Sequence, residues 1–243
     1  MLTIVIPTYN EAEYLPLLLR SLEMQTFRDF EVVVADNHST DLTREIAREH
    51  GCRIVDGGMP AGGRNRGAEA ANGEAILFLD ADVILPDPWF LQMTVAEFAR
   101  RNLGVATCGV KPISSRNVDK VIHEVFNYFM WVTRAMAPHA PGFCIFARRD
   151  VHRAIGGFDE AITLAEDHDY AERAAKESKF GILKTYKVPV SVRRFDRDGR
   201  LNVAVKYMLC ELHMRTAGAV KNDFFNYTFG YPAASRAKQT RKK

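Results

Sequence analysis

Short, strongly apolar runs alternate with amphipathic helical patterns in the first third of the 243-residue chain. The clearest runs are residues 2–6, 30–35 and 75–79, and we expect a shorter strand at residues 52–55. Strands that are apolar on both faces are buried on both faces, which is typical of a parallel sheet between two layers of helices. Regular alternation of strands and helices favours the same arrangement. We therefore expect an α/β fold with a mostly parallel central sheet and helices on both faces.

A polar cluster follows each of the three clearest runs. The clusters are residues 7–11 (PTYNE), 36–41 (DNHSTD) and 80–82 (DAD). In open α/β sheets, ligands bind beyond the carboxyl ends of the strands. We expect the three clusters to meet there and to line one crevice.

The third cluster places two carboxylates, Asp80 and Asp82, at the end of an apolar run. Two ionised carboxylates so close together repel each other unless a cation lies between them or one binds a proton. Mg²⁺ and Mn²⁺ favour carboxylate oxygens together with the phosphate oxygens of a substrate. The pair therefore indicates a divalent cation that holds a diphosphate, and a solvated acidic turn is the alternative.

The remaining elements follow from periodicity and from residues that start or end helices. We expect the first helix to open at Asn10, and Ser39 or Thr40 to cap a helix that ends near His50. Further helices are expected at residues 62–71, 86–101, 119–136, 166–178 and 201–217, and further strands at residues 105–110, 142–147 and 187–194.

Composition excludes several classes of protein. The net charge is only +3 with both signs interspersed, so we expect no nucleic-acid partner. Four cysteines lie far apart without a C-x-x-C pair, which argues against a zinc site and favours free thiols in a cytoplasmic protein. No apolar run approaches the roughly 18 residues of a membrane span. The start LTIVIP lacks the features of a signal peptide. We expect a cytoplasmic protein that is soluble or bound to the membrane face, where the basic tail at residues 236–243 is either solvated or in contact with anionic lipid.

The ordered set VIPTYNE, VVVADNHSTDLT, GGRNRGAEAANGEAILFLDADVILP, GGFDE and AEDHDY resembles the family 2 glycosyltransferases. The resemblance spans about residues 2–194 and implies the nucleotide-diphospho-sugar transferase (GT-A) fold, a Rossmann-like arrangement with an acceptor-side second half. We accordingly expect one GT-A domain over residues 1–200, with a nucleotide-sugar half (1–110) and an acceptor half (111–200). A C-terminal helix and basic tail would follow at residues 201–243.

The resemblance assigns roles to individual residues. Pro7, Tyr9 and Glu11 would line the nucleoside pocket, and Asp36 would hydrogen-bond the base. Asp80 would contact the ribose or the metal, and Asp82 would hold the metal against the diphosphate. In the relatives the Asp of the E-D pair is the catalytic base, which assigns that role to Asp167.

Three arginines complete the expected nucleotide-sugar site. Arg64 lies in a glycine-rich stretch and could reach the base or a phosphate. Arg193 and Arg194, at the end of the last expected strand, could clamp the diphosphate. Each assignment has a plain alternative: a helix-capping turn for Asp36, a first-turn helix acid for Asp167 and surface charges for the arginines.

These roles indicate a metal-dependent glycosyltransferase that uses Mn²⁺ or Mg²⁺, and the resemblance to the family implies that it is inverting. A sugar would move from a nucleoside-diphosphate sugar to the hydroxyl of a glycan or of a lipid-linked acceptor in one displacement. Two alternatives remain open. LFLDADVI loosely matches the signature of haloacid dehalogenase phosphatases, and the chain could also be a non-catalytic nucleotide-sugar-binding module.

Two amphipathic stretches, residues 119–136 and 201–220, are rich in large apolar side chains, and aromatic residues follow the second at positions 224–229. Such stretches pack in the core or form a homodimer interface in most proteins. The alternative is contact with a membrane surface.

Overall fold

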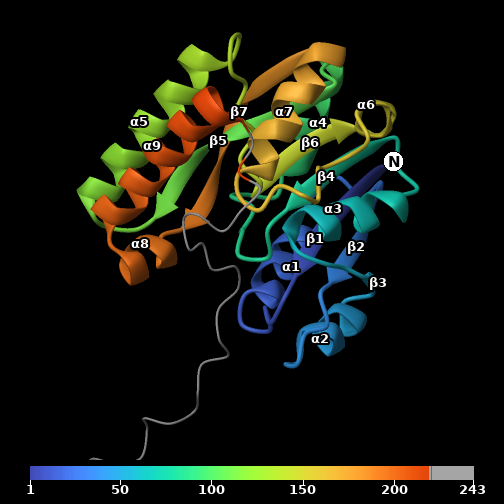
Figure 1. Ribbon diagram of the computed structural model, residues 1–243. Coiled ribbons are helices and arrows are strands. Elements are labelled where there is room, and N and C mark those ends of the chain that lie inside the picture. Colours follow the sequence, from blue (N-terminus) through green and yellow to red (C-terminus); the bar gives the residue numbers. More distant parts are fainter. Residues whose placement is uncertain (219, 221–243) are drawn as a thin grey trace, which may run out of the picture.

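A computed structural model describes residues 1–218 and 220 of the chain (Figure 1). Within these residues one seven-stranded sheet has the order β3-β2-β1-β4-β6-β5-β7. The strands are β1 (Leu2–Thr8), β2 (Phe30–Asp36), β3 (Arg53–Asp56), β4 (Ala75–Leu79), β5 (Val105–Ile113), β6 (Cys144–Arg148) and β7 (Phe180–Ser191). All pairs are parallel except those of β6, which runs antiparallel to both of its neighbours. The expected mostly parallel α/β fold is confirmed.

Helices cover both faces of the sheet (Figure 1). The helices of the described residues are α1 (Leu15–Glu23), α2 (Thr43–Glu49), α3 (Pro60–Glu69), α4 (Phe90–Arg100), α5 (Asn117–Thr133), α6 (Arg149–Ala154), α7 (Glu166–Glu177), α8 (Arg193–Asp198) and α9 (Arg200–Ala217). Leu77 and Leu79 of β4 share one apolar cluster with α1, α2 and α4. Ile76 and Phe78 share the other with α3, α6 and α7. The period of two in β4 therefore divides the core into two layers.

The glycine-rich composition of α3 allows it to lie close to the sheet. A Cβ atom added at Gly67 would come within 2.2 Å of Cγ1 of Val5 in β1. Because any larger side chain would push the helix outward, glycine is required at this contact. The close approach brings the polar residues of α3 near the carboxyl ends of the strands.

The reversed strand β6 decides which loops reach the carboxyl edge of the sheet. Cys144, its first residue, pairs with Leu79, the last residue of β4. The segment before β6 therefore lies at the edge where the parallel strands end, and the segment after β6 lies at the opposite edge. We call the former the carboxyl edge.

Several expected boundaries are wrong. α1 begins at Leu15 rather than at Asn10, and α8 and the short helix α6 were not expected. Arg193 and Arg194 lie in the first turn of α8 and not at a strand end, because β7 stops at Ser191. The core strands were placed well because short apolar runs between turn residues favour strands, whereas a charged segment such as RRFDRD favours neither strand nor helix.

The four cysteines form no disulfide with one another, and Cys108, Cys144 and Cys210 are buried. Among the described residues no helix combines the length and the apolar character needed to cross a membrane. The basic tail and the aromatic residues at positions 224–229 lie outside the described residues.

Candidate active site

The loops after β1 and β2 are joined at the carboxyl edge. Three successive backbone N–H groups of the first loop donate hydrogen bonds of 2.8 to 3.1 Å to side-chain oxygens of the second; the donors are Asn10, Glu11 and Ala12, and the acceptors are Ser39, Thr43 and Asp41. Asn10 has a left-handed backbone (φ 55), which asparagine tolerates better than most residues. These contacts hold the first loop out of helical geometry, which is why no helix starts at Asn10.

Asp36 ends β2 and is fully buried. Its carboxylate accepts hydrogen bonds from the hydroxyl groups of Thr8 at 3.0 Å and Ser39 at 2.6 Å, and it forms an ion pair with Arg44 at 3.2 Å. Ser39 thus donates to Asp36 instead of capping a helix. The residue at the N-cap of α2 is Leu42 and no side chain caps this helix, so the expected capping by Ser39 or Thr40 is wrong. Hydrogen bonding of Asp36 to a nucleobase stays a prediction.

Pro7 and Tyr9 lie on the same edge. A Cβ atom added at Gly63 of α3 would lie 3.1 Å from Cβ of Pro7, so the proline packs tightly against that helix. Tyr9 is 44% exposed and offers a ring face to solvent. A planar base could stack on such a face.

Arg193 reaches from α8 into the carboxyl edge. Its guanidinium lies 3.1 Å from a carboxylate oxygen of Asp82 and 3.5 Å from one of Glu11. It also lies over the ring of Tyr14, 4.3 Å from the ring centre. The structure therefore brings Arg193 together with the predicted site, whereas Arg194 donates a hydrogen bond of 3.2 Å to the hydroxyl of Tyr207 in α9.

Three carboxylates, those of Glu11, Asp80 and Asp82, influence one another at this edge. Burial raises the pKa of Glu11 to about 7 against the opposing effect of Arg193, and Asp82 and Asp80 raise it further. Burial and Asp80 also raise the pKa of Asp82. Such mutual repulsion is what a divalent cation relieves, so the donor set of oxygens fits Mg²⁺ or Mn²⁺. The described residues do not form a ready-made group of three metal ligands.

Arg64 of α3 connects Asp80 to Glu166, the residue before the predicted base. One terminal nitrogen donates to Glu166 at 2.7 Å and the other to Asp80 at 3.0 Å. The side chain is only 4% exposed and lies 5.4 Å from the ring centre of Phe158. The alternative of a surface charge is therefore wrong. Contact of Arg64 with the nucleotide stays a prediction, and the contacts observed are with carboxylates.

Asp167 lies in the first turn of α7, beside Glu166. One carboxylate oxygen accepts a hydrogen bond of 2.6 Å from the backbone N–H of Gly142, and the other accepts one of 2.9 Å from the N–H of His168. The side chain is 18% exposed, so a solvent-borne hydroxyl can approach it. Ala165, just before the helix, has a left-handed backbone (φ 63) that costs free energy for a residue with a Cβ atom.

Gly142 lies between Arg64 and Asp167. A Cβ atom there would lie 2.4 Å from a terminal nitrogen of Arg64 and 3.4 Å from a carboxylate oxygen of Asp167. This glycine belongs to the segment before β6, which reaches the carboxyl edge because β6 is reversed. It permits the N–H contact to Asp167 without displacing Arg64.

Two histidine rings pack next to Asp167. His139 and His168 meet edge to face with ring centres 4.5 Å apart, and Phe129 of α5 packs on the other side of His139 at 5.0 Å. His168 Nε2 lies 3.9 Å from Asp167. The wall beside the predicted base is therefore partly aromatic and is shared with α5.

Sequence reasoning missed Tyr14, Gly142 and the pairing of Glu166 with Arg64. Tyr14 was hidden by the expectation that it lay inside a helix. The only available signal for Gly142 was the Pro-Gly pair that precedes an apolar strand. Nothing in the sequence indicates that residues 64 and 166 are in contact.

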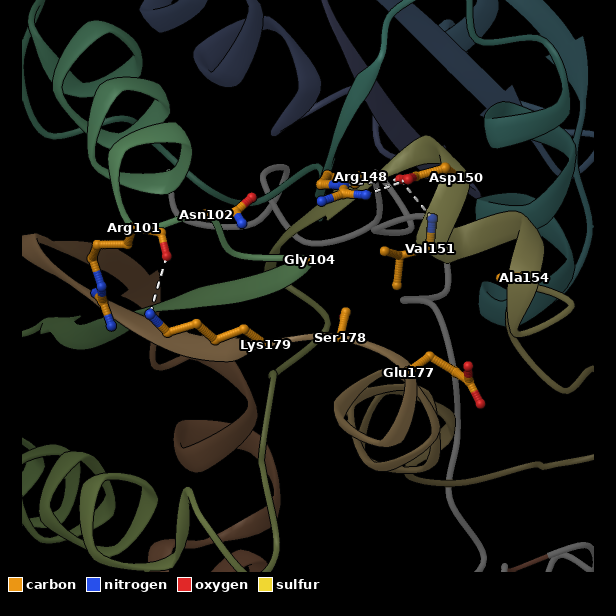
Figure 2. A pocket seen from close by; sticks show the side chains of 10 residues that line it. All are labelled: Arg101, Asn102, Gly104, Arg148, Asp150, Val151, Ala154, Glu177, Ser178 and Lys179. Atoms are coloured by element: carbon orange, nitrogen blue, oxygen red, sulfur yellow. Dashed lines mark hydrogen bonds and ion pairs between the residues drawn. The ribbon is translucent and has the colours of Figure 1, made fainter.

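The structure also contains a cavity of about 440 Å³ at the opposite edge of the sheet. Figure 2 shows its lining, in which Arg148 and Asp150 form an ion pair and Lys179 donates to the backbone carbonyl of Arg101 at 3.1 Å. Its walls come from the ends of α4 and α7, the start of β5 and the residues after β6. It is separate from the predicted site.

The family profile described as Glycosyl transferase family 2 matches residues 3–156 of the chain. Over 109 residues the chain is 39% identical to a validoxylamine A glucosyltransferase of Streptomyces hygroscopicus subsp. jinggangensis. This match covers 41% of the chain and 26% of that protein. The chain thus spans only about a quarter of the length of this relative.

Solved structures show the same fold. A mannosyltransferase of Pyrobaculum calidifontis, in complex with GDP-Man and Mn²⁺, superposes with a TM-score of 0.69 at 21% identity, covering 90% of this chain and 65% of that one. Residues 1–349 of TarS from S. aureus, in complex with UDP-GlcNAc, give a TM-score of 0.65 at 23% identity, covering 78% and 58% of the two chains. The expected GT-A fold is confirmed.

Proposed function

The chain belongs to glycosyl transferase family 2, and we propose that it transfers a sugar from a nucleoside-diphosphate sugar to an acceptor hydroxyl with inversion at the anomeric carbon. The acceptor we propose is a glycan or a lipid-linked molecule. The observation that carries the proposal is the link through Arg64, which bonds Asp80 on one side and Glu166, the neighbour of Asp167, on the other. The carboxylates that would hold a cation against the donor diphosphate and the carboxylate that would accept a proton from the acceptor are thereby held in one site.

On the donor side, Pro7, Tyr9, Glu11 and Asp36 would surround the nucleoside. Arg193 would approach the diphosphate together with Arg194, since two phosphates carry negative charge that guanidinium groups bind well. Asp80 and Asp82 would hold a divalent cation, which when bound would neutralise charge on the leaving diphosphate. The proposal draws support from the Mn²⁺ in the complex of the Pyrobaculum calidifontis relative.

On the acceptor side, Asp167 would act as the general base. Its carboxylate takes the proton of the acceptor hydroxyl while that oxygen forms a bond to the anomeric carbon. The bond between the anomeric carbon and the diphosphate oxygen breaks, and the electron pair leaves with the nucleoside diphosphate. The N–H groups of Gly142 and His168 orient the carboxylate, and Gly142 keeps Arg64 in place beside it. No covalent enzyme intermediate is needed.

Family membership favours this transferase over the phosphatase alternative. We propose the division into residues 1–110 for the donor and 111–200 for the acceptor on the same basis, because the donor residues named above other than the two arginines lie in the first range and Asp167 in the second. Residues 201–243 would be the C-terminal helix and tail.

The test is release of nucleoside diphosphate from a panel of nucleotide sugars, measured with and without Mn²⁺. Asp167→Asn should lower transfer by about 10²–10⁴-fold while leaving donor binding intact, because a positioned base is lost. Asp82→Asn should remove the stimulation by Mn²⁺. Asp29→Asn, an exposed aspartate that pairs with the amino terminus, is the matched control and should not change the rate.

Two results would refute the proposal. Full transfer activity in Asp167→Asn would rule out the base. Binding of nucleotide sugars without turnover, across the panel and with Mn²⁺ present, would identify a non-catalytic binding module instead.

A further inference from the structure

The outer face of α5 is apolar along its whole length. Five side chains spaced three or four residues apart point away from the sheet and are between 46% and 67% exposed: Val118, Val121, Val125, Tyr128 and Val132. The inner face is fixed by Asn127, which bonds both backbone groups of Val110 in β5 at 2.8 Å. The orientation of α5 is therefore set, and its apolar stripe faces solvent.

The helix α9 presents a second apolar stripe. Leu201, Val205, Met208 and Leu209 are between 37% and 78% exposed. Figure 1 shows α9 beside α5 on the flank of the molecule that lies beyond β5 and β7. We call the two stripes together the α5/α9 face. The expected core packing is therefore confined to the inner sides of the two helices, where Met130 and Val203 are buried, and a homodimer interface stays a prediction.

Ion pairs hold the two helices in this arrangement. Arg200 forms two bonds, of 2.6 and 3.0 Å, with the fully buried carboxylate of Asp119, and Ser114 donates a third at 2.6 Å. Arg116 and Asp196 form a further pair between the two segments. Because a fork-shaped pair fixes geometry as well as distance, it holds the starts of α5 and α9 in a defined orientation. A monomer seldom leaves so many large apolar side chains together without a binding partner.

The charge around the α5/α9 face indicates the partner. Residues 116–134 and 194–210 contain seven Lys and Arg residues against four Asp and Glu residues, a net charge of +3 that equals the net charge of the whole chain. Two copies of this face would therefore repel each other. Apolar stripes within a cationic surround are instead typical of helices that lie in the interface of an anionic membrane.

We propose that the α5/α9 face binds an anionic lipid surface, with the two helices lying parallel to it and their apolar stripes inserted. Lys120 and Arg134 of the α5 segment and Lys206 of α9 would contact the lipid headgroups. The face is continuous with the active site through α8, which precedes α9 and carries Arg193. A membrane-borne acceptor would then approach Asp167 along α5. Lipid binding itself does not depend on the proposed transfer reaction.

The test is flotation of the full-length chain with vesicles. Wild type should float with vesicles of phosphatidylcholine and phosphatidylglycerol at low salt, and less so at high salt or with pure phosphatidylcholine. A variant that combines Val121→Gln, Val125→Gln and Leu201→Gln should bind at least about tenfold more weakly, because three inserted apolar side chains are lost. The matched control combines Leu17→Gln, Met24→Gln and Met93→Gln, which are also exposed but lie elsewhere, and it should bind like wild type.

Three outcomes would overturn the inference. Wild type could stay with the soluble fraction. The triple variant, which keeps the basic tail, could bind as well as wild type, which would assign binding to the tail. Sedimentation could reveal a dimer that the triple variant abolishes, which would assign the face to a second copy. Turnover of nucleotide sugars in solution, measured on the same preparations, reports separately on the proposed function.

Discussion

Removing Arg64 should destabilise the protein far more than removing an exposed arginine of the same helix. The guanidinium of Arg64 pairs with Glu166 at 2.7 Å, and the two side chains are only 4% and 9% exposed. Although burial disfavours the charge, the carboxylates of Asp80 and Glu166 raise the pKa of Arg64. Burial and Asp167 already raise the pKa of Glu166 against the effect of Arg64. Without the arginine, the carboxylates of Asp80 and Glu166 would lose the cation that pairs with both.

The cost of breaking a buried ion pair by removing one partner is about 3–5 kcal/mol, so we expect Arg64→Met to lower the free energy of unfolding by that amount. Glu166→Gln should cost only about 1 kcal/mol, because its amide oxygen can still accept from Arg64, which keeps its bond to Asp80. The double variant should cost less than the sum of the two by at least about 1.5 kcal/mol, since the partners are in direct contact.

The assay is urea unfolding at neutral pH, and Arg66→Met is the control. Arg66 lies on the same helix and pairs with Glu160 at 3.3 Å, but both side chains are more than 40% exposed. Its loss should cost less than about 1 kcal/mol. Equal costs for Arg64→Met and Arg66→Met, or strict additivity in the double variant, would refute the role of Arg64 as a buried bridge.

Three further predictions concern single positions. Gly142→Ala should lower stability by about 1–3 kcal/mol and reduce turnover, because the methyl group meets Arg64; an unchanged melting curve would contradict it. The pKa of His152 is lowered to about 4 by burial and by the charges of Arg173 and Arg153. Between about pH 6.5 and 4 the unfolded chain therefore binds one proton more than the folded chain. The free energy of unfolding should fall by about 3 kcal/mol as the pH is lowered across that range. His152→Phe should lose this slope, and an equal slope in both proteins would rule it out. Ala165→Gly should raise the free energy of unfolding by about 1 kcal/mol through relief of the left-handed backbone, and no gain in urea unfolding would show that the strain is absent.

The parallel core was predictable because buried strands and their following helices have distinct hydrophobic periods. The reversal of β6 was not, since an apolar run such as CIFA reads the same in either direction of pairing. The sequence also did not predict which face of α5 is exposed to solvent. Its apolar residues occur on more than one side of the helix, so periodicity alone could not separate the face on β5 from the face in solvent.

The candidate site was predictable where it follows strand ends, as Asp36 and Asp80 do. It was not predictable where long-range pairing decides geometry. The bond of Arg64 to Glu166 joins residues 102 positions apart, and Arg193 reaches Asp82 only because β7 ends early and α8 turns back. Local sequence carries no information about such pairs, whereas it does specify which strand ends are polar.

The reversed strand also affects how the chain is completed on the ribosome. β4 lies between β1 and β6, so after β1, β2 and β4 have paired, one edge of β4 remains open until residues 144–148 emerge. Newly made β5 cannot close that edge, because its partners are β6 and β7. For the synthesis of about 65 residues, at roughly 5–20 residues per second, the nascent protein exposes an apolar strand edge. Slowing translation between β4 and β6 should therefore promote association of nascent chains, whereas slowing it after β7 should not.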